Sequence, residues 1–249
     1  MIRVTNYFAI LRVDKIKSVS RAGERLRHNR RLIPCATATP GVKNARLILN
    51  EQMRKDKYKP FKQIFKERLG GQKIRKNAVY ALEIVCAFSP GSVPPEKYKE
   101  WTKENAEWIK KIFGEKNIID CQCHYDEKTF HNHFFVIPQD ENGRLNARKF
   151  IGGSRNRMTE LQTDYANAME KFGLRRGVSG KITKAHHESS RRWHASQAEK
   201  EERLEAYEKK FGTEATWDFD MVLEFRRLKD KNKTDAPPEL KVSITDKTK

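Results

Sequence analysis

Four side chains that can hold a metal ion or transfer a proton lie within ten residues, in the segment HYDEKTFHNH. They are His124, Glu127, His131 and His133. Imidazole nitrogens and carboxylate oxygens are common protein ligands of divalent metals. Three of the chain's seven histidines fall in this one segment. The segment therefore predicts a metal site, and the plainer alternative is a hairpin that carries surface histidines.

The strands expected around this segment would bring the three histidines together. Residues 117–125 and 130–138 read as strands, and the polar residues DEKT between them favour an antiparallel turn. Because His131 and His133 are two residues apart, their side chains leave the same face of a strand. His124 ends the preceding strand and would lie beside them. Three protein ligands that leave positions free for water or substrate are typical of a catalytic metal site.

A second segment, RHNRR at residues 27–31, places His28 among three arginines. Guanidinium groups bind phosphate oxygens through paired hydrogen bonds. Spacing alone therefore predicts a basic loop that contacts phosphate.

The charge balance points to a polyanionic partner. The chain has 52 Lys and Arg against 33 Asp and Glu, a net charge of +19, and nucleic acid is the commonest partner of such a protein. The sequence contains neither an apolar stretch of about 18 residues, which a spanning helix needs, nor a signal peptide. We therefore expect a cytoplasmic protein with no membrane span.

Apolar periodicity predicts the elements that position these residues. The expected strands are 2–13, 78–89, 117–125, 130–138 and a short one at 145–150. The expected helices are a stretch near 43–55, one from 61 to Gly70, and those at 95–113 and 154–172. This pattern predicts an α+β domain over residues 1–195, with a central antiparallel sheet flanked by helices. A basic helical extension is expected at 196–230 and a disordered tail at 231–249.

The two segments together resemble the relaxases of the MobV family, the plasmid mobilisation and recombination (Mob/Pre) proteins. In that family an H-N-x-R segment precedes an H-x-D-E-x-T-P-H-x-H motif by roughly a hundred residues. Here HNRR at 28–31 fits the first motif, and the segment at 124–133 fits the second except at Phe130, where the family usually has proline. The similarity covers about residues 1–195.

The resemblance implies a His-hydrophobe-His (HUH) endonuclease domain. Such a relaxase would nick one strand at a plasmid transfer origin by metal-dependent transesterification, for conjugative mobilisation or plasmid recombination. His28 would be the nucleophile and form a covalent adduct with the 5′-phosphate, and Glu127 would act as a base. The metal, Mn²⁺ or Mg²⁺, would be held by His124, His131 and His133.

The same resemblance names the partners. The substrate would be origin DNA, single-stranded or supercoiled, and a conjugation coupling protein and a second copy of the chain are further candidates. Basic and amide side chains around the two motifs are expected to contact DNA. They are Arg27, Asn29, Arg30, Arg31, Lys73, Arg75 and Lys76.

Two other functions remain open from the sequence. Rolling-circle replication initiators use a related metal module with a tyrosine nucleophile, and Tyr207 lies in a matching YEKK segment. The other alternative is a non-enzymatic DNA-binding protein stabilised by a metal. A structural zinc site would need a fourth Cys or His ligand, and none is suitably spaced.

Overall fold

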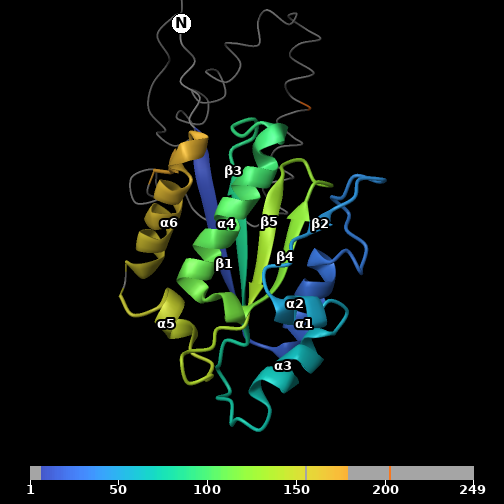
Figure 1. Ribbon diagram of the computed structural model, residues 1–249, viewed down its shortest axis with the longest axis vertical. Coiled ribbons are helices and arrows are strands. Elements are labelled where there is room, and N and C mark those ends of the chain that lie inside the picture. The colour runs from blue at the N-terminus through green and yellow to red at the C-terminus, as the bar shows by residue number, and fades with distance from the viewer. Residues whose placement is uncertain (1–6, 155, 179–201, 203–249) are drawn as a thin grey trace, which may run out of the picture. The chain divides into compact units, whose positions relative to one another are not determined.

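A six-stranded sheet forms the centre of the part of the chain that the computed structural model describes, residues 7–154, 156–178 and 202 (Figure 1). Its strand order is β2-β4-β5-β3-β1-β6. The strands are β1 (Phe8–Ile16), β2 (Ala45–Arg46), β3 (Ala81–Phe88), β4 (Ile118–His124), β5 (His131–Val136) and β6 (Arg175–Arg176). All neighbouring strands are antiparallel except β1 and β6, which are parallel. The sheet is therefore mixed, because a two-residue strand at one edge departs from the predicted antiparallel pattern.

Helices cover both faces of the sheet (Figure 1). The helices are α1 (Val19–Asn29), α2 (Glu51–Lys55), α3 (Phe61–Leu69), α4 (Tyr98–Phe113), α5 (Ala147–Ile151) and α6 (Arg157–Ala168). On one face, Trp101 of α4 and Tyr165 of α6 join a large apolar core with Phe134 of β5. On the other face, Leu26 of α1 and Phe61 of α3 form a smaller core with Phe135, Ile137 and Ala81.

Helix α1 carries the first motif and has clear local reasons to begin and end where it does. The Ser18 side chain accepts a hydrogen bond from the Arg21 amide, which caps the first turn. Ala22 and Leu26 are buried against the sheet. The helix ends at Asn29, and Arg31 then adopts a positive φ of 53°. The chain thus turns sharply within the motif.

Most predicted elements are confirmed in kind and place. The structure has strands within 78–89, 117–125 and 130–138, and an α-helix and a 3₁₀ turn cover 95–113. Two predictions are wrong. Residues 147–151 form helix α5 rather than a strand, because Asn146 caps that helix through the Lys149 amide. Within the predicted helical stretch 43–55, the structure has β2 followed by the short helix α2.

The predicted extension at 196–230, apart from Glu202, and the predicted tail at 231–249 lie outside the described residues, as does Tyr207. The chain divides into two units, Met1–Ser179 and Gly180–Lys249, and the fold above is that of the first. No described helix has the length and apolarity that a membrane span requires.

Candidate metal centre

The three histidines of the second motif meet at one end of the sheet. His124 ends β4 and pairs with His131, the first residue of β5, while His133 pairs with Gln122. The ring centroids are 4.6 to 5.1 Å apart. One ring nitrogen from each histidine lies within 4.8 Å of those of the other two. Strand alternation and the hairpin turn therefore bring together the three ligands that the sequence predicts.

Each histidine uses one ring nitrogen to contact an oxygen atom, which leaves its other nitrogen as the candidate metal ligand; in His124 that nitrogen, Nδ1, lies 3.2 Å from Arg31 Nη2. The pairs are His124 Nε2 with the Asn29 carbonyl at 2.8 Å, His131 Nδ1 with the Thr129 carbonyl at 2.8 Å, and His133 Nδ1 with Glu83 Oε1 at 3.0 Å. A nitrogen that donates to oxygen carries the proton, so the opposite nitrogen carries the lone pair. This second set of contacts is typical of metal-binding histidines and fits a divalent ion.

Burial keeps the imidazoles of His124 and His131 neutral. Desolvation, then the neighbouring His133 and Arg31, lowers the pKa of His124 to about 3. Burial and then His133 lower the pKa of His131. Since only the neutral ring offers a lone pair, both side chains are in the metal-binding form at neutral pH.

Glu83 of β3 is a functional candidate that the sequence analysis missed. Its side chain is 2% exposed. Its Oε1 accepts from Asn29 Nδ2 at 2.7 Å and from His133, and its Oε2 lies 3.4 Å from Arg25 Nε. Burial alone would raise the pKa of Glu83, but the contacts with His133, Arg25 and Asn29 lower it overall. The signal was present, because Glu83 is the one charged residue in the apolar run AVYALEIVCAFS.

His28 lies in the last turn of α1 and is half-buried. Burial lowers its pKa, and the charges of Arg31 and His133 lower it further, while Glu127 and Glu83 act in the opposite direction. Since these charges act on the ring, His28 is within electrostatic reach of the histidine centre. The structure thus brings both predicted motifs to the same end of the sheet.

Arg31 joins the two motifs. Its guanidinium donates to both Asp126 oxygens, at 2.7 and 2.8 Å, and to Glu127 Oε1 at 2.5 Å. The same Nη2 lies 3.2 Å from His124 Nδ1. Hydrogen bonding from Arg31 lowers the pKa of Asp126 to about 2. Arg31 and Glu127 therefore both border the centre, and the arginine holds the turn between β4 and β5 against the end of α1.

Two residues predicted to contact DNA have internal partners instead. Arg30 is 8% exposed, with its Nε 3.0 Å from Asp120, and Arg46 bonds the other oxygen of the same carboxylate at 2.5 Å. Asn29 is buried, with its side chain on Glu83 and its carbonyl on His124. In this structure Arg30 and Asn29 thus hold other parts of the protein in place, and their contact with DNA stays a prediction.

Three other predicted DNA contacts lie at the far end of the sheet. Lys73, Arg75 and Lys76 are exposed in the loop before β3, which begins at Ala81. His133 pairs with Val85, four residues or roughly 14 Å farther along the strand. These three cations therefore lie away from the histidine centre, and their contact with DNA stays a prediction. Arg27 is exposed on α1, next to His28.

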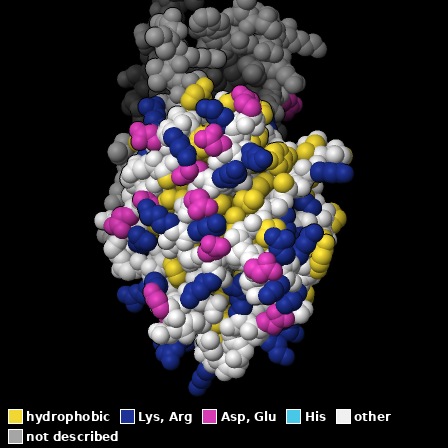
Figure 2. Space-filling view, in the orientation of Figure 1, with side chains coloured by type: hydrophobic (Ala, Val, Ile, Leu, Met, Phe, Trp, Pro, Cys, Tyr) yellow, Lys and Arg dark blue, Asp and Glu magenta, His cyan; other side chains and the backbone are white. Residues whose placement is uncertain are grey.

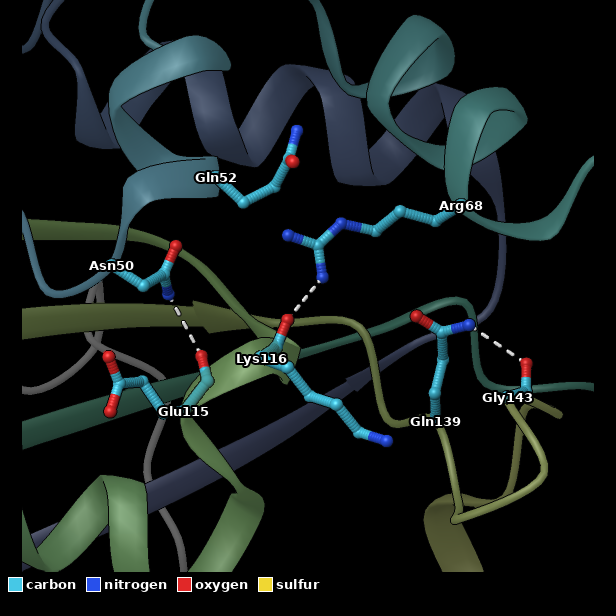
Figure 3. A pocket seen from close by; sticks show the side chains of 7 residues that line it. All are labelled: Asn50, Gln52, Arg68, Glu115, Lys116, Gln139 and Gly143. Carbon is cyan, nitrogen blue, oxygen red and sulfur yellow. Dashed lines mark hydrogen bonds between the residues drawn. The ribbon is translucent and has the colours of Figure 1, made fainter.

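Two cavities accompany the sheet. One, of about 710 Å³, adjoins the centre and is lined by Asn29, Arg31 and Asp126 together with the cations Lys43 and Arg46. The other, of about 570 Å³, lies around Asn50, Arg68 and Lys116 near the start of β4 (Figure 3). Since His124 ends that seven-residue strand, the second cavity is about 20 Å from the histidines.

Comparison with known proteins agrees with this geometry. The model of the plasmid recombination enzyme family (Mob_Pre) matches residues 5–195. A 65 kDa protein of Zymomonas mobilis is 36% identical over 74% of this chain and 32% of its own length. Plasmid recombination enzyme type 1 of Staphylococcus aureus is 28% identical over 73% of this chain and 47% of its own. The chain thus spans a third to a half of these relatives.

Solved structures match the fold. The MobM relaxase domain, in Mn-bound crystals with oriT DNA of plasmid pMV158, superposes with TM-scores of 0.61 and 0.63 in two structures. It is 22–23% identical over 76–77% of this chain and 98% of its own. The sheet flanked by helices therefore has the same fold as the MobM relaxase domain. Together with the family match over residues 5–195, this establishes that the chain belongs to the plasmid recombination enzyme (Mob/Pre) family.

Proposed function

We propose that this protein nicks and rejoins one strand of plasmid DNA at a transfer origin, with His28 as the nucleophile, during mobilisation or recombination. One observation carries the proposal: the helix that bears His28 is bonded to the three-histidine centre through Asn29 and Arg31. The MobM relaxase domain, which shares the fold, is bound to origin DNA. We expect the same substrate class here.

The second ring nitrogens of His124, His131 and His133 would hold a divalent ion, once Arg31 Nη2 moves away from His124 Nδ1. Mn²⁺ fits three nitrogen ligands better than Mg²⁺, which prefers oxygen, and the MobM crystals are Mn-bound. When bound, the ion supplies positive charge that offsets the phosphodiester and orients the scissile bond. Glu83 keeps His133 in the required tautomer.

His28 is suited to attack phosphorus because its lowered pKa keeps the ring neutral. Its nitrogen lone pair forms an N–P bond, and the bond from phosphorus to the 3′-oxygen breaks. The proton on the other ring nitrogen of His28 passes to Glu127, whose carboxylate is partly exposed, whereas Glu83 is already bonded to three partners. The leaving oxygen takes up a proton from water and becomes a free 3′-hydroxyl.

The DNA strand has a basic path to this centre. The cavity beside it is lined by the exposed Lys43, and Arg27 is exposed on the adjoining helix. Phosphate contacts of this kind position a strand without reading its sequence. A conjugation coupling protein and a second copy of the chain stay predictions as further partners.

The test is to incubate the full chain with supercoiled DNA carrying the adjacent plasmid origin and Mn²⁺, and to map the nick. His28→Ala should abolish both the nick and the covalent adduct, and Tyr207→Phe should leave both intact. The wild-type adduct should be acid-labile, as a phosphoramidate is. An acid-stable adduct that disappears in Tyr207→Phe would refute the histidine nucleophile and support a replication initiator.

A further inference from the structure

Two arginines in the wall of the larger cavity share a single buried carboxylate. Arg30 Nε lies 3.0 Å from Asp120 Oδ2, and Arg46 Nε lies 2.5 Å from Asp120 Oδ1. The other hydrogen bonds of the two guanidinium groups go to the backbone carbonyls of Lys59 and Met53. Among the described residues, no second carboxylate forms an ion pair with either arginine. One of the two positive charges therefore lacks a counter-ion, which is costly for a buried group.

Each of these guanidinium groups also has one nitrogen without a hydrogen bond. Arg30 Nη2 and Arg46 Nη1 are buried, and neither has a partner in the described part of the chain. The two side chains are only 8% and 14% exposed. Buried polar atoms are rarely left unpaired in native proteins, and an unpaired one indicates a missing water, ion or ligand. An anion would supply both the missing hydrogen-bond acceptors and the missing negative charge.

Both arginines line the cavity of about 710 Å³ that adjoins the histidine centre. Arg46 pairs with Gln122 of β4, two residues or about 7 Å along the strand from His124. Asn29 and Arg31 line the same cavity and also contact His124. The arginine pair is therefore next to the centre and on its side of the sheet.

The cavity has room for more than a phosphate group. Its volume lies in the range of about 300–1,000 Å³ that is typical of small-molecule sites. Leu32, Val42 and Lys43 are exposed and line it, so its mouth is apolar with one cation. A nucleotide matches this lining, because its base presents broad, weakly polar faces and its phosphate is an anion.

The other cavity has a balanced set of charges. Its Arg68, which points into it in Figure 3, lies 3.9 Å from Asp56 Oδ2. Lys59 lies 3.2 Å from Asp56 and 2.6 Å from Glu67, so two cations face two carboxylates. On the α4 side of the sheet, Lys and Arg side chains are likewise interspersed with Asp and Glu (Figure 2). Arg68 is therefore a matched control for Arg46, since it is 12% exposed and also lines a cavity.

We propose that the cavity beside the histidine centre binds a nucleotide of the DNA strand within two nucleotides of the scissile phosphate. Arg30 and Arg46 hold the phosphate of this nucleotide, and Asp120 holds the two guanidinium groups in place. This inference rests on the proposed function and adds a second phosphate subsite to the same centre. A phosphate bound there positions the strand without reading its sequence.

The first test replaces single phosphates by uncharged methylphosphonates in a single-stranded oligonucleotide that spans the mapped nick, with the full chain. One position within two nucleotides of the nick should weaken wild-type binding about tenfold, because charge-assisted hydrogen bonds are lost. The same replacement should have little further effect on Arg46→Gln, which has already lost the contact. Arg68→Gln should respond as the wild type does. Losses that simply add in Arg46→Gln at every position would overturn the proposal.

Inorganic sulfate tests the arginine pair without DNA. Urea unfolding is measured with a chelator, and sulfate replaces chloride at constant ionic strength. Sulfate at ten times its dissociation constant should raise the folding equilibrium constant of the wild type and of Arg68→Gln about tenfold, beyond its general stabilising effect on proteins. Arg46→Gln should show only the general effect, since Arg30 and Asp120 then balance each other. Equal gains in all three proteins would overturn the proposal.

A competition on the wild type guards against misfolding of Arg46→Gln. Sulfate should displace the unmodified oligonucleotide more effectively than the one with a methylphosphonate at the identified position, and equal displacement would contradict the proposal. Failure of the wild type to nick origin DNA would refute the proposed function, whereas the sulfate result decides the anion site by itself. If the wild type nicks but no phosphate position depends on Arg46, only the second subsite is refuted.

Discussion

The two faces of the central sheet differ in chemistry although the same strands build both. Along β5, Phe134 and Val136 enter the apolar core beneath α4 and α6, while His131 and His133 leave the opposite face beneath α1. Along β4, Cys121 and Cys123 face the core, while Asp120 and His124 face α1. The alternation of a strand thus separates residues that stabilise the fold from residues that do chemistry.

The polar face is costly to fold. It holds two nearly buried carboxylates, Asp120 and Glu83, and each is stable only because cationic or amide groups bond it. Buried ion pairs contribute little net stability, but removing one partner leaves an uncompensated charge. The large core beneath α4 and α6, together with the smaller core beneath α1 and α3, must therefore supply most of the stability on which these buried charges depend.

Neighbouring residues of β5 give the most direct test of this division. Phe134→Ala should lower the free energy of unfolding by about 3–5 kcal/mol, because it opens a cavity in the fully buried core. His133→Ala should cost less stability and remove metal binding instead. Denaturant unfolding and calorimetric titration with Mn²⁺ measure the two effects. Similar losses of stability in both variants would contradict the division of labour between the faces.

Glu83→Gln should affect the metal more than the fold. The amide can still accept a hydrogen bond but lacks the charge that polarises His133, so Mn²⁺ affinity should fall by about 10- to 100-fold. Titration of the variant with Mn²⁺ measures this. Glu107→Gln is the matched control, since Glu107 is an exposed carboxylate on α4 and should bind Mn²⁺ as the wild type does. An unchanged affinity in Glu83→Gln would assign the carboxylate a purely structural role.

The contrast between the faces also explains what the sequence predicted well. Strand alternation is local, so the apolar run of β3 and the convergence of His124, His131 and His133 could be predicted from periodicity and one turn. The partners of Glu83 and Arg30 are 54 and 90 residues away, and no local pattern encodes them. The two-residue strand β6 and the cap that makes α5 a helix are too short to leave a periodic signal.

Acid should lower the free energy of unfolding of the metal-free protein, because its buried histidines resist protonation. The pKa of His124 is about 3 in the fold against an ordinary 6.5, so between these values the unfolded chain binds a proton that the folded chain does not. Stability is therefore full above pH 6.5 and falls as pH drops, by about 1.4 kcal/mol per unit for this one proton. His131 and His28, whose pKa values are also lowered, add in the same direction.

Urea unfolding at pH 7, 6 and 5 in the presence of a chelator measures this slope. His124→Gln should reduce it by about 1.4 kcal/mol per pH unit, since one titrating group is removed. A stability that is flat across this range would show that the histidines are not held neutral by burial.

The smallest expected effect is on the salt dependence of DNA binding, and it differs between cations at the two ends of the sheet. Arg27 is exposed beside His28, whereas Lys73, Arg75 and Lys76 lie at the opposite end of the sheet. If the strand enters at the histidine end, Arg27→Gln should reduce the slope of log affinity against log salt by about one unit. Replacing all three distal cations with glutamine should leave the slope unchanged.

Both slopes are measured from binding of origin DNA between 50 and 200 mM salt. Over this range one phosphate contact changes affinity only about threefold to fourfold. A slope reduced by about three in the triple variant would show that DNA extends along the whole sheet and would restore the contacts first expected from the sequence.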